Sequence, residues 1–261
     1  MSSPPLIAAP DSALVADLVP SPNIEPRLRG LTPSILVLHY TGLPTIERSL
    51  DVLSRPDCKV SCHYVVDVDG RIVQMVAETM RAWHAGVSSW RGETDINSAS
   101  VGIEIQNPGH ALGYPEFPEA QMRAVIALAR DICTRHSIAL DCVLAHSDIA
   151  PSRKIDPGEK FDWRRLAENG VGFWLPPEPI DAQEHGFEQG SDTPVVREAR
   201  ELLARFGYGV ELEGPLDADL AFVLRAFQLH FRPAKVDSRL DRSTLVTLRR
   251  LVDALPVPAT V

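Results

Sequence analysis

The chain has 261 residues, 44% of them hydrophobic and 23% charged, which is enough apolar sequence for one large and one small core. Its 26 lysines and arginines against 35 aspartates and glutamates give a formal net charge of −9, which argues against a nucleic-acid partner. No apolar run approaches the length of a membrane span, so no membrane partner is expected either.

Residues 1–20 read MSSPPLIAAPDSALVADLVP and are predicted to be a flexible segment. They contain no lysine or arginine, and Asp11 and Asp17 interrupt the apolar residues, so the basic start and unbroken apolar core of a secretory signal are missing. No cysteine precedes Cys58, so no lipoprotein attachment site is present. We therefore expect a cytoplasmic protein, or a periplasmic one if a native leader was removed.

Residues 21–174 have the strand and helix patterns of an α/β domain. Apolar runs predict buried strands, and apolar residues at helical spacing predict helices that cover them. The turn Val68-Asp69-Gly70 predicts a hairpin between two of the strands. In chain order, strands are expected at 35–40, 63–67, 71–76, 101–106 and 140–145, and helices at 45–54 and 118–137. This order predicts a mixed central sheet flanked by helices.

The composition changes after residue 174. Residues 175–194 contain four prolines and two glycines with acidic residues between them, which predicts a linker or a partly ordered segment. Three stretches with helical apolar spacing follow, so residues 195–256 are expected to form a small three-helix domain. The ten basic and ten acidic residues of 190–261 cancel, so the net negative charge belongs to the larger domain.

Two histidines and an aspartate are candidate metal ligands. His39 lies at the end of the first predicted strand, at the sheet edge where open α/β sheets bind ligands. His146 follows the last predicted strand and begins a polar loop, residues 146–158, that also contains Asp156. These residue types suit Zn²⁺, and three of them leave one tetrahedral position for water, as in catalytic zinc sites. The simpler alternative is that they are a strand-end histidine and solvated loop side chains.

A second possible metal set is Cys58 and Cys62 with the adjacent His63. No second thiol pair with ligand spacing accompanies them, so structural or idle thiols are the favoured interpretation.

Glu104 is the candidate general base. Alternation in the predicted strand 101–106 puts it on the same face as Gly102, and a glycine suggests a face that opens on a cleft. Near a metal, Glu104 could take a proton from water and pass it to a leaving nitrogen. The alternative is a carboxylate that only orients a metal ligand.

Four segments resemble, in order, the motifs of the zinc-dependent N-acetylmuramoyl-L-alanine amidases of the amidase-2 family, which is related to phage T7 lysozyme and peptidoglycan recognition proteins. They are His39-Tyr40-Thr41, Ala82-Trp83-His84-Ala85-Gly86, Val101-Gly102-Ile103-Glu104-Ile105 and residues 146–158. The resemblance implies a T7-lysozyme-like fold with Zn²⁺ on His39, His146 and Asp156. It also implies Glu104 as the base and Lys154 as the cation that stabilises the oxyanion. A solvated lysine is the alternative for Lys154.

The resemblance also suggests substrate contacts. Trp83 and His84 are expected to line the substrate groove, and Asn107 to form a turn at its edge. Arg81 and Arg153 are candidates to bind the carboxylates of a peptide, because planar guanidinium suits bidentate recognition. Ordinary surface arginines are the alternative for both.

The last predicted domain resembles the small three-helix peptidoglycan-binding domain, through Gly214-Pro215-Leu216-Asp217 and Ala226-Phe227-Gln228. Residues 237–244 lack the usual Asp-Gly pair of its second loop, so a helical bundle kept for stability or dimerisation is the alternative.

The function expected from the resemblance is hydrolysis of the amide bond between the lactyl group of N-acetylmuramic acid and L-alanine. Soluble muropeptides, including the 1,6-anhydro form made in wall recycling, are the expected partners, and no protein partner is inferred. The alternatives are a non-catalytic peptidoglycan receptor and a secreted wall lysin.

Overall fold

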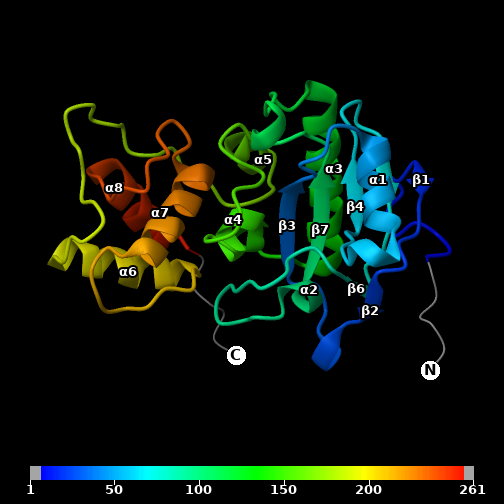
Figure 1. The fold of residues 1–261 in the computed structure, drawn as a ribbon, viewed down its shortest axis with the longest axis horizontal. Helices are drawn as coiled ribbons and strands as arrows, with labels where there is room; N and C mark the ends of the chain where they lie inside the picture. The colour runs from blue at the N-terminus through cyan, green and yellow to red at the C-terminus, as the bar shows by residue number, and fades with distance from the viewer. Residues whose placement is uncertain (1–6, 256–261) are drawn as a thin grey trace.

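A six-stranded mixed sheet forms the centre of the larger domain in the computed structural model, which describes residues 7–255 (Figure 1). Its strand order is β1-β5-β4-β7-β3-β8, in which β3 pairs in parallel with β7 and β8, and β4 pairs antiparallel with β5. The strands are β1 Asp17–Leu18, β3 Ile35–Tyr40, β4 Tyr64–Val66, β5 Ile72–Gln74, β7 Ser100–Ile105 and β8 Val143–Ala145. The predicted mixed sheet with flanking helices is confirmed.

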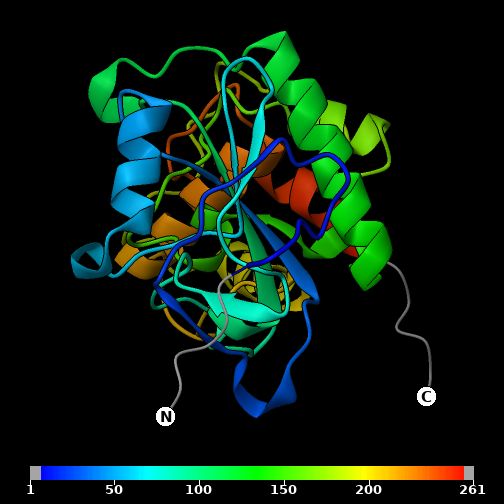
Figure 2. The same ribbon diagram turned by 90° about the vertical axis from the view of Figure 1, so that its right-hand side faces the viewer.

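Two long helices cover opposite faces of this sheet, as Figure 2 shows. Leu36 and Leu38 of β3 pack toward α3 (Glu119–His136), whereas Val65 and Val73 pack toward α1 (Ile46–Ser54). Both helices follow their predicted ranges within one residue at each end. The expected strand at 140–145 is shorter, because a 3₁₀ turn at Leu140–Cys142 precedes β8.

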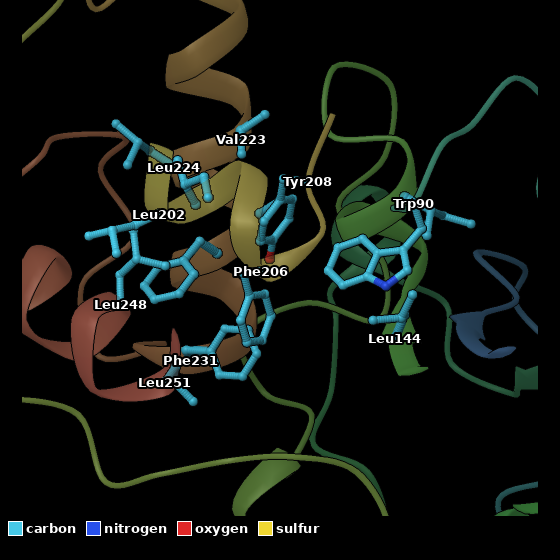
Figure 3. Close-up of a cluster of buried hydrophobic side chains, with 14 of the residues drawn as sticks. Trp90, Leu144, Leu202, Phe206, Tyr208, Val223, Leu224, Phe231, Leu248 and Leu251 are labelled. Atoms are coloured by element: carbon cyan, nitrogen blue, oxygen red, sulfur yellow. The ribbon is translucent and has the colours of Figure 1, made fainter. Parts of the chain in front are cut away.

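The C-terminal part consists of α6 (Pro194–Phe206), α7 (Ala218–Phe231) and α8 (Arg242–Asp253), as the three helical periods predicted. These helices share one apolar cluster with the sheet domain, in which Val37, Trp90 and Leu144 pack with helix residues. Figure 3 shows Trp90 and Leu144 in this cluster. Trp90 is 1% exposed, and its ring centroid lies 5.0 Å from that of Tyr208. The proline-rich segment therefore does not separate two independent cores.

Two segments expected to be loosely structured pack against the rest of the protein. Asp17–Leu18 pairs in parallel with β5 as an edge strand, while residues 1–6 of the predicted flexible segment lie outside the described residues. The proline-rich segment runs along α8, where the Glu178 amide donates to Thr247 Oγ1 and Phe187 bridges to Leu240. Both are held by hydrogen bonds that no local pattern signals.

Several short elements were not predicted, because fewer than two turns give no periodic signal. They are β2 Ile24–Pro26 and β6 Met80–Ala82, which form a separate antiparallel pair, the helices α2 Ile96–Ala99, α4 His146–Ile149 and α5 Trp163–Glu168, and the 3₁₀ turns Leu28–Gly30, Pro56–Cys58 and His110–Leu112. Within residues 7–255, every helix is too short or too polar to cross a lipid bilayer.

Candidate active site

Three candidate metal ligands meet at one edge of the sheet. β3 and β8 are parallel neighbours, so His39 near the end of β3 and His146 directly after β8 lie side by side. His39 Nδ1 lies 2.8 Å from His146 Nδ1 and 3.3 Å from Asp156 Oδ2, and His146 Nδ1 lies 3.0 Å from the same oxygen. All three side chains are buried, and among residues 7–255 they are the one cluster with potential ligand atoms this close together.

The three atoms fit a small divalent metal such as Zn²⁺. Zinc bonds of about 2.0–2.1 Å with tetrahedral angles put neighbouring donor atoms about 3.3 Å apart, close to the distances found here. The second nitrogen of each ring is already engaged: His39 Nε2 lies 3.0 Å from His84 Nδ1, and His146 Nε2 lies 3.2 Å from the Ala85 carbonyl oxygen. Such outer hydrogen bonds fix ring orientation and leave Nδ1 for the metal.

The electrostatics keep His39 and Asp156 in the protonation states that a metal requires. Burial, together with the adjacent His146, lowers the pKa of His39 to about 4. Burial alone would raise the pKa of Asp156, but His146 and His39 hold it well below the usual range. A neutral imidazole and a charged carboxylate are the ligand forms, so protons compete weakly at neutral pH.

Glu104 stands beside this cluster, paired with His39 across β7 and β3. Paired residues of neighbouring strands project from the same face, so the carboxylate lies on the face that carries the ligands. Its Oε2 is buried without a hydrogen-bond partner. Burial raises the pKa of Glu104 well above its ordinary value, and the Asp156 charge raises it further. An unpaired carboxyl with a raised pKa is suited to proton transfer.

His84 lies behind His39. Its Nδ1 meets His39 Nε2, its Nε2 lies 3.2 Å from Ser100 Oγ, and the residue is 9% exposed. The expected opening at Gly102 is filled by this ring, because a Cβ on Gly102 would lie 2.6 Å from His84 atoms. The glycine therefore makes room for His84, which also borders the cavity predicted for substrate.

A cavity of about 400 Å³ opens next to the ligands. Lys154 and Trp83 line it together with Glu104. Arg153, which directly precedes Lys154 in the same loop, also borders it. The Arg153 guanidinium donates to the Ala85 and Val87 carbonyl oxygens, so its position is fixed by the turn that follows β6. The structure thus brings these predicted residues around one space.

Two predicted substrate residues lie away from this cavity. Arg81 is held by Glu25 Oε2 at 2.6 Å and by Asp95 Oδ1 at 3.3 Å, which both engage its guanidinium. Asn107 is 2% exposed; its Nδ2 donates to the Pro115 carbonyl and its Oδ1 accepts from the Gly109 amide. In these contacts Asn107 stabilises a turn, and neither residue shares the cavity wall with Glu104.

A cluster on the other side of the cavity was missed from the sequence. Tyr40 Oη lies 3.1 Å from His110 Nδ1, and the His110 ring stacks on Tyr114 with centroids 4.0 Å apart. Tyr114 Oη donates to the Pro157 carbonyl oxygen at 2.6 Å, beside the ligand Asp156. Tyr40 belongs to one of the four motifs that resemble the family, but His110 lies in none of them and carries no local signal.

The chain is similar to known proteins over most of its length. The family description N-acetylmuramoyl-L-alanine amidase matches residues 29–159. N-acetylmuramoyl-L-alanine amidase AmiD of Escherichia coli is 39% identical over 235 residues, which cover 84% of this chain and 82% of the relative. The 1,6-anhydro-N-acetylmuramyl-L-alanine amidase AmpD of Citrobacter freundii is 36% identical over 57% of this chain and 86% of its own.

Solved structures give the same result. AmiD from E. coli in complex with anhydro-N-acetylmuramic acid-L-Ala-D-gamma-Glu-L-Lys has a TM-score of 0.71 at 38% identity, covering 86% of this chain and 91% of that one. AmpDh3 from Pseudomonas aeruginosa in complex with anhydromuramic pentapeptide has a TM-score of 0.75 at 32% identity, covering 89% and 96%. The likeness includes the C-terminal helices, because 86% and 89% of the chain is more than residues 1–174 alone could supply.

Proposed function

We propose a mechanism from one premise: the chain belongs to the N-acetylmuramoyl-L-alanine amidase family, known as amidase-2. It is an enzyme that hydrolyses the amide bond between the lactyl group of N-acetylmuramic acid and the L-alanine of the stem peptide, in peptidoglycan turnover. The assignment of roles to its residues is the proposal.

His39, His146 and Asp156 would hold one Zn²⁺ ion. Support comes from the convergence of two Nδ1 atoms and one carboxylate oxygen, each from a buried side chain. When bound, the ion would lower the pKa of a water molecule and polarise the amide carbonyl. The protein's own task is to hold the ligand atoms in place and to move protons beside them.

Glu104 would accept the proton of the attacking water and return it to the alanine nitrogen as the bond breaks. Its free Oε2 and its raised pKa support this role, because a base must both take up and release the proton near neutral pH. Lys154 lines the same cavity and would stabilise the negative oxygen of the tetrahedral intermediate. Trp83 and Arg153 would contact the sugar and peptide at the rim.

The preferred substrates would be soluble muropeptides, including the 1,6-anhydro form. The ligands named for the AmiD and AmpDh3 complexes are both anhydromuramic peptides, and these proteins resemble this chain over more than four fifths of its length.

The helical domain would bind glycan. In support, a second cavity of about 1060 Å³ lies between the sheet domain and α6–α7, and Arg153 borders both cavities. The cellular location stays a prediction, which fractionation of native cells would test.

The observation that carries the proposal is the unpaired Glu104 carboxyl beside three converging ligand atoms. Metal analysis of purified protein should give one Zn²⁺ per chain. Mass spectrometry of defined anhydro and reducing-end muropeptides should show release of peptides that begin with L-alanine, stopped by a chelator and restored by Zn²⁺. Metal bound instead through Cys58, Cys62 and His63, or muropeptide binding without hydrolysis, would contradict it.

A further inference from the structure

Asp148 is a buried carboxylate two residues after the ligand His146, in the one-turn helix α4. It is 1% exposed and accepts three hydrogen bonds. The Ala145 amide donates to Oδ2 at 2.8 Å, the Tyr208 hydroxyl to Oδ1 at 2.6 Å, and His230 Nδ1 lies 2.7 Å from Oδ2. Two of these three partners belong to the C-terminal part of the chain, 60 and 82 residues away.

α4 connects Asp148 to the metal ligands. A helix of four residues has no stability of its own, so tertiary contacts must hold it. The Ala150 amide donates to the His146 carbonyl and the Ser147 amide to the Asp156 carbonyl, at 3.0 and 3.1 Å. A shift of Asp148 would therefore move His146 and pull on the loop that carries Asp156. In Figure 1, α4 lies between α7 and β3.

The two partners from the helical part are themselves held in place. The His230 ring is stacked between Trp163 and Phe231, with centroid distances of 3.7 and 3.9 Å. Tyr208 packs edge-on against Trp90, and burial together with the Asp148 charge raises the pKa of its phenol well above the usual value. The phenol thus remains a donor. Tyr208 reaches Asp148 from the apolar cluster that Figure 3 shows in part, and His230 from its stack with Trp163 and Phe231.

We propose that the C-terminal helices position the metal ligand His146 through the hydrogen bonds of Tyr208 and His230 to Asp148. Neither Tyr208 nor His230 touches the metal or the substrate cavity, so both are positioning residues. The inference rests on the proposed metal set and adds to it a role for the helical domain that is separate from glycan binding.

The size of the effect follows from the cost of an unsatisfied buried carboxylate. Losing one donor leaves Asp148 to find another partner, which it can do only if α4 moves. Groups that hydrogen-bond directly to a metal ligand typically change metal affinity by about 10- to 100-fold. Tyr208 and His230 act one step further away, through Asp148 and α4, so we expect a loss of about 10-fold when both donors are removed, and a smaller one for each alone.

The test uses the full-length protein and the variants Tyr208→Phe, His230→Phe and the double variant. Phenylalanine keeps the packing in both cases and removes the hydrogen bond. The Zn²⁺ dissociation constant is measured by competition with a chromophoric chelator, and the absorption spectrum of the Co²⁺ form reports ligand geometry. We expect weaker metal binding by about 10-fold in the double variant, and an altered Co²⁺ spectrum.

Arg91→Gln is the matched control. Arg91 Nη2 lies 2.6 Å from Asp141 Oδ2, and Arg91 Nε and Nη2 donate to the Phe206 carbonyl oxygen across the same domain junction at 3.3 Å, with no hydrogen bond to α4. This variant should lose stability but keep the metal constant and the Co²⁺ spectrum. Equal weakening in Arg91→Gln, or unchanged metal binding in the double variant, would overturn the inference. Wild-type protein that binds no metal would overturn the proposed function itself, which is a different result.

Discussion

The two histidine ligands are supported from different parts of the molecule. His39 is backed by His84 and Ser100, which belong to the sheet domain. His146 Nε2 lies 3.2 Å from the Ala85 carbonyl oxygen, and the backbone of His146 begins α4, in which Asp148 is held by Tyr208 and His230 of the C-terminal part. One half of the metal site is thus built from a motif and its neighbouring strand, while the other half depends on packing between domains.

The two histidine ligands therefore depend on different contacts. On the sheet side, His84 fits against Gly102 in β7, the strand that pairs with β3. On the helix side, α7 packs on α4. A site with this construction should respond differently to changes on its two sides, and the following predictions start with the largest expected effect.

Glu104→Gln should lower turnover by at least about 10²-fold, the usual loss for a missing general base. Both supports remain intact in this variant, so the Zn²⁺ dissociation constant should stay at the wild-type value. Steady-state hydrolysis of an anhydromuropeptide and chelator competition measure the two quantities. Glu116→Gln, which changes a carboxylate with 77% side-chain exposure, is the control. Near-normal turnover would leave Glu104 with only an orienting role.

His84→Phe should weaken Zn²⁺ binding by about 10- to 100-fold. The phenyl ring fills the space over Gly102 but cannot hydrogen-bond to His39 Nε2. Ser100→Ala, one step further from the metal, should have a smaller effect in the same direction. Metal affinity that does not change in His84→Phe would show that the sheet side needs no such support, and the comparison between the two sides would fail.

Part of this site could be predicted from the sequence because its signals are local. An apolar run that ends in a histidine predicted β3 and His39, and the loop after the last strand contains both His146 and Asp156. Helical spacing predicted α3 and the three C-terminal helices, since each is long enough to be periodic. Glu104 followed from strand alternation and from the family resemblance.

The remainder could not be predicted because its partners are distant in the sequence. Nothing near Asp148 indicates that Tyr208 and His230 will hydrogen-bond to it, and α4 is too short for a periodic signal. Arg81 was predicted to bind substrate, but its guanidinium is held by Glu25, its partner in the β2–β6 pair, and by Asp95, the N-cap of α2. Long-range ion pairs of this kind depend on topology.

The pH dependence of stability should identify the buried histidines of the sheet side. In metal-free protein, burial lowers the pKa of His39 to about 4 and that of His63 to about 3, from an ordinary value of 6.5. The unfolded chain binds these protons first, so the free energy of unfolding should fall as pH drops from 6.5 toward 4. Each proton taken up contributes a slope of about 1.4 kcal/mol per pH unit.

Glu104 changes the free energy of unfolding with pH in the opposite direction to the two histidines. Its raised pKa means that the folded protein holds a proton that the unfolded chain releases above 4.5, so this contribution to stability is lost as pH rises. Glu104→Gln should therefore make the rise in stability between pH 4.5 and 6.5 steeper than in the wild type. Urea unfolding at several pH values measures both slopes, and an unchanged slope would contradict the raised pKa.

The smallest effect is expected for Glu198→Gln, which tests whether any disturbance of the helical domain reaches the metal. Glu198 on α6 pairs with Arg249 on α8 at 2.6 Å, and both side chains are well exposed, at 38% and 44%. Exposed ion pairs contribute about 0–1 kcal/mol, so urea unfolding should show a loss within that range. The Zn²⁺ dissociation constant should not change, because this pair is not connected to α4. If Glu198→Gln weakened metal binding as much as Tyr208→Phe, the helical domain would act on the site through its general stability, and the hydrogen bonds to Asp148 would have no special part in holding His146.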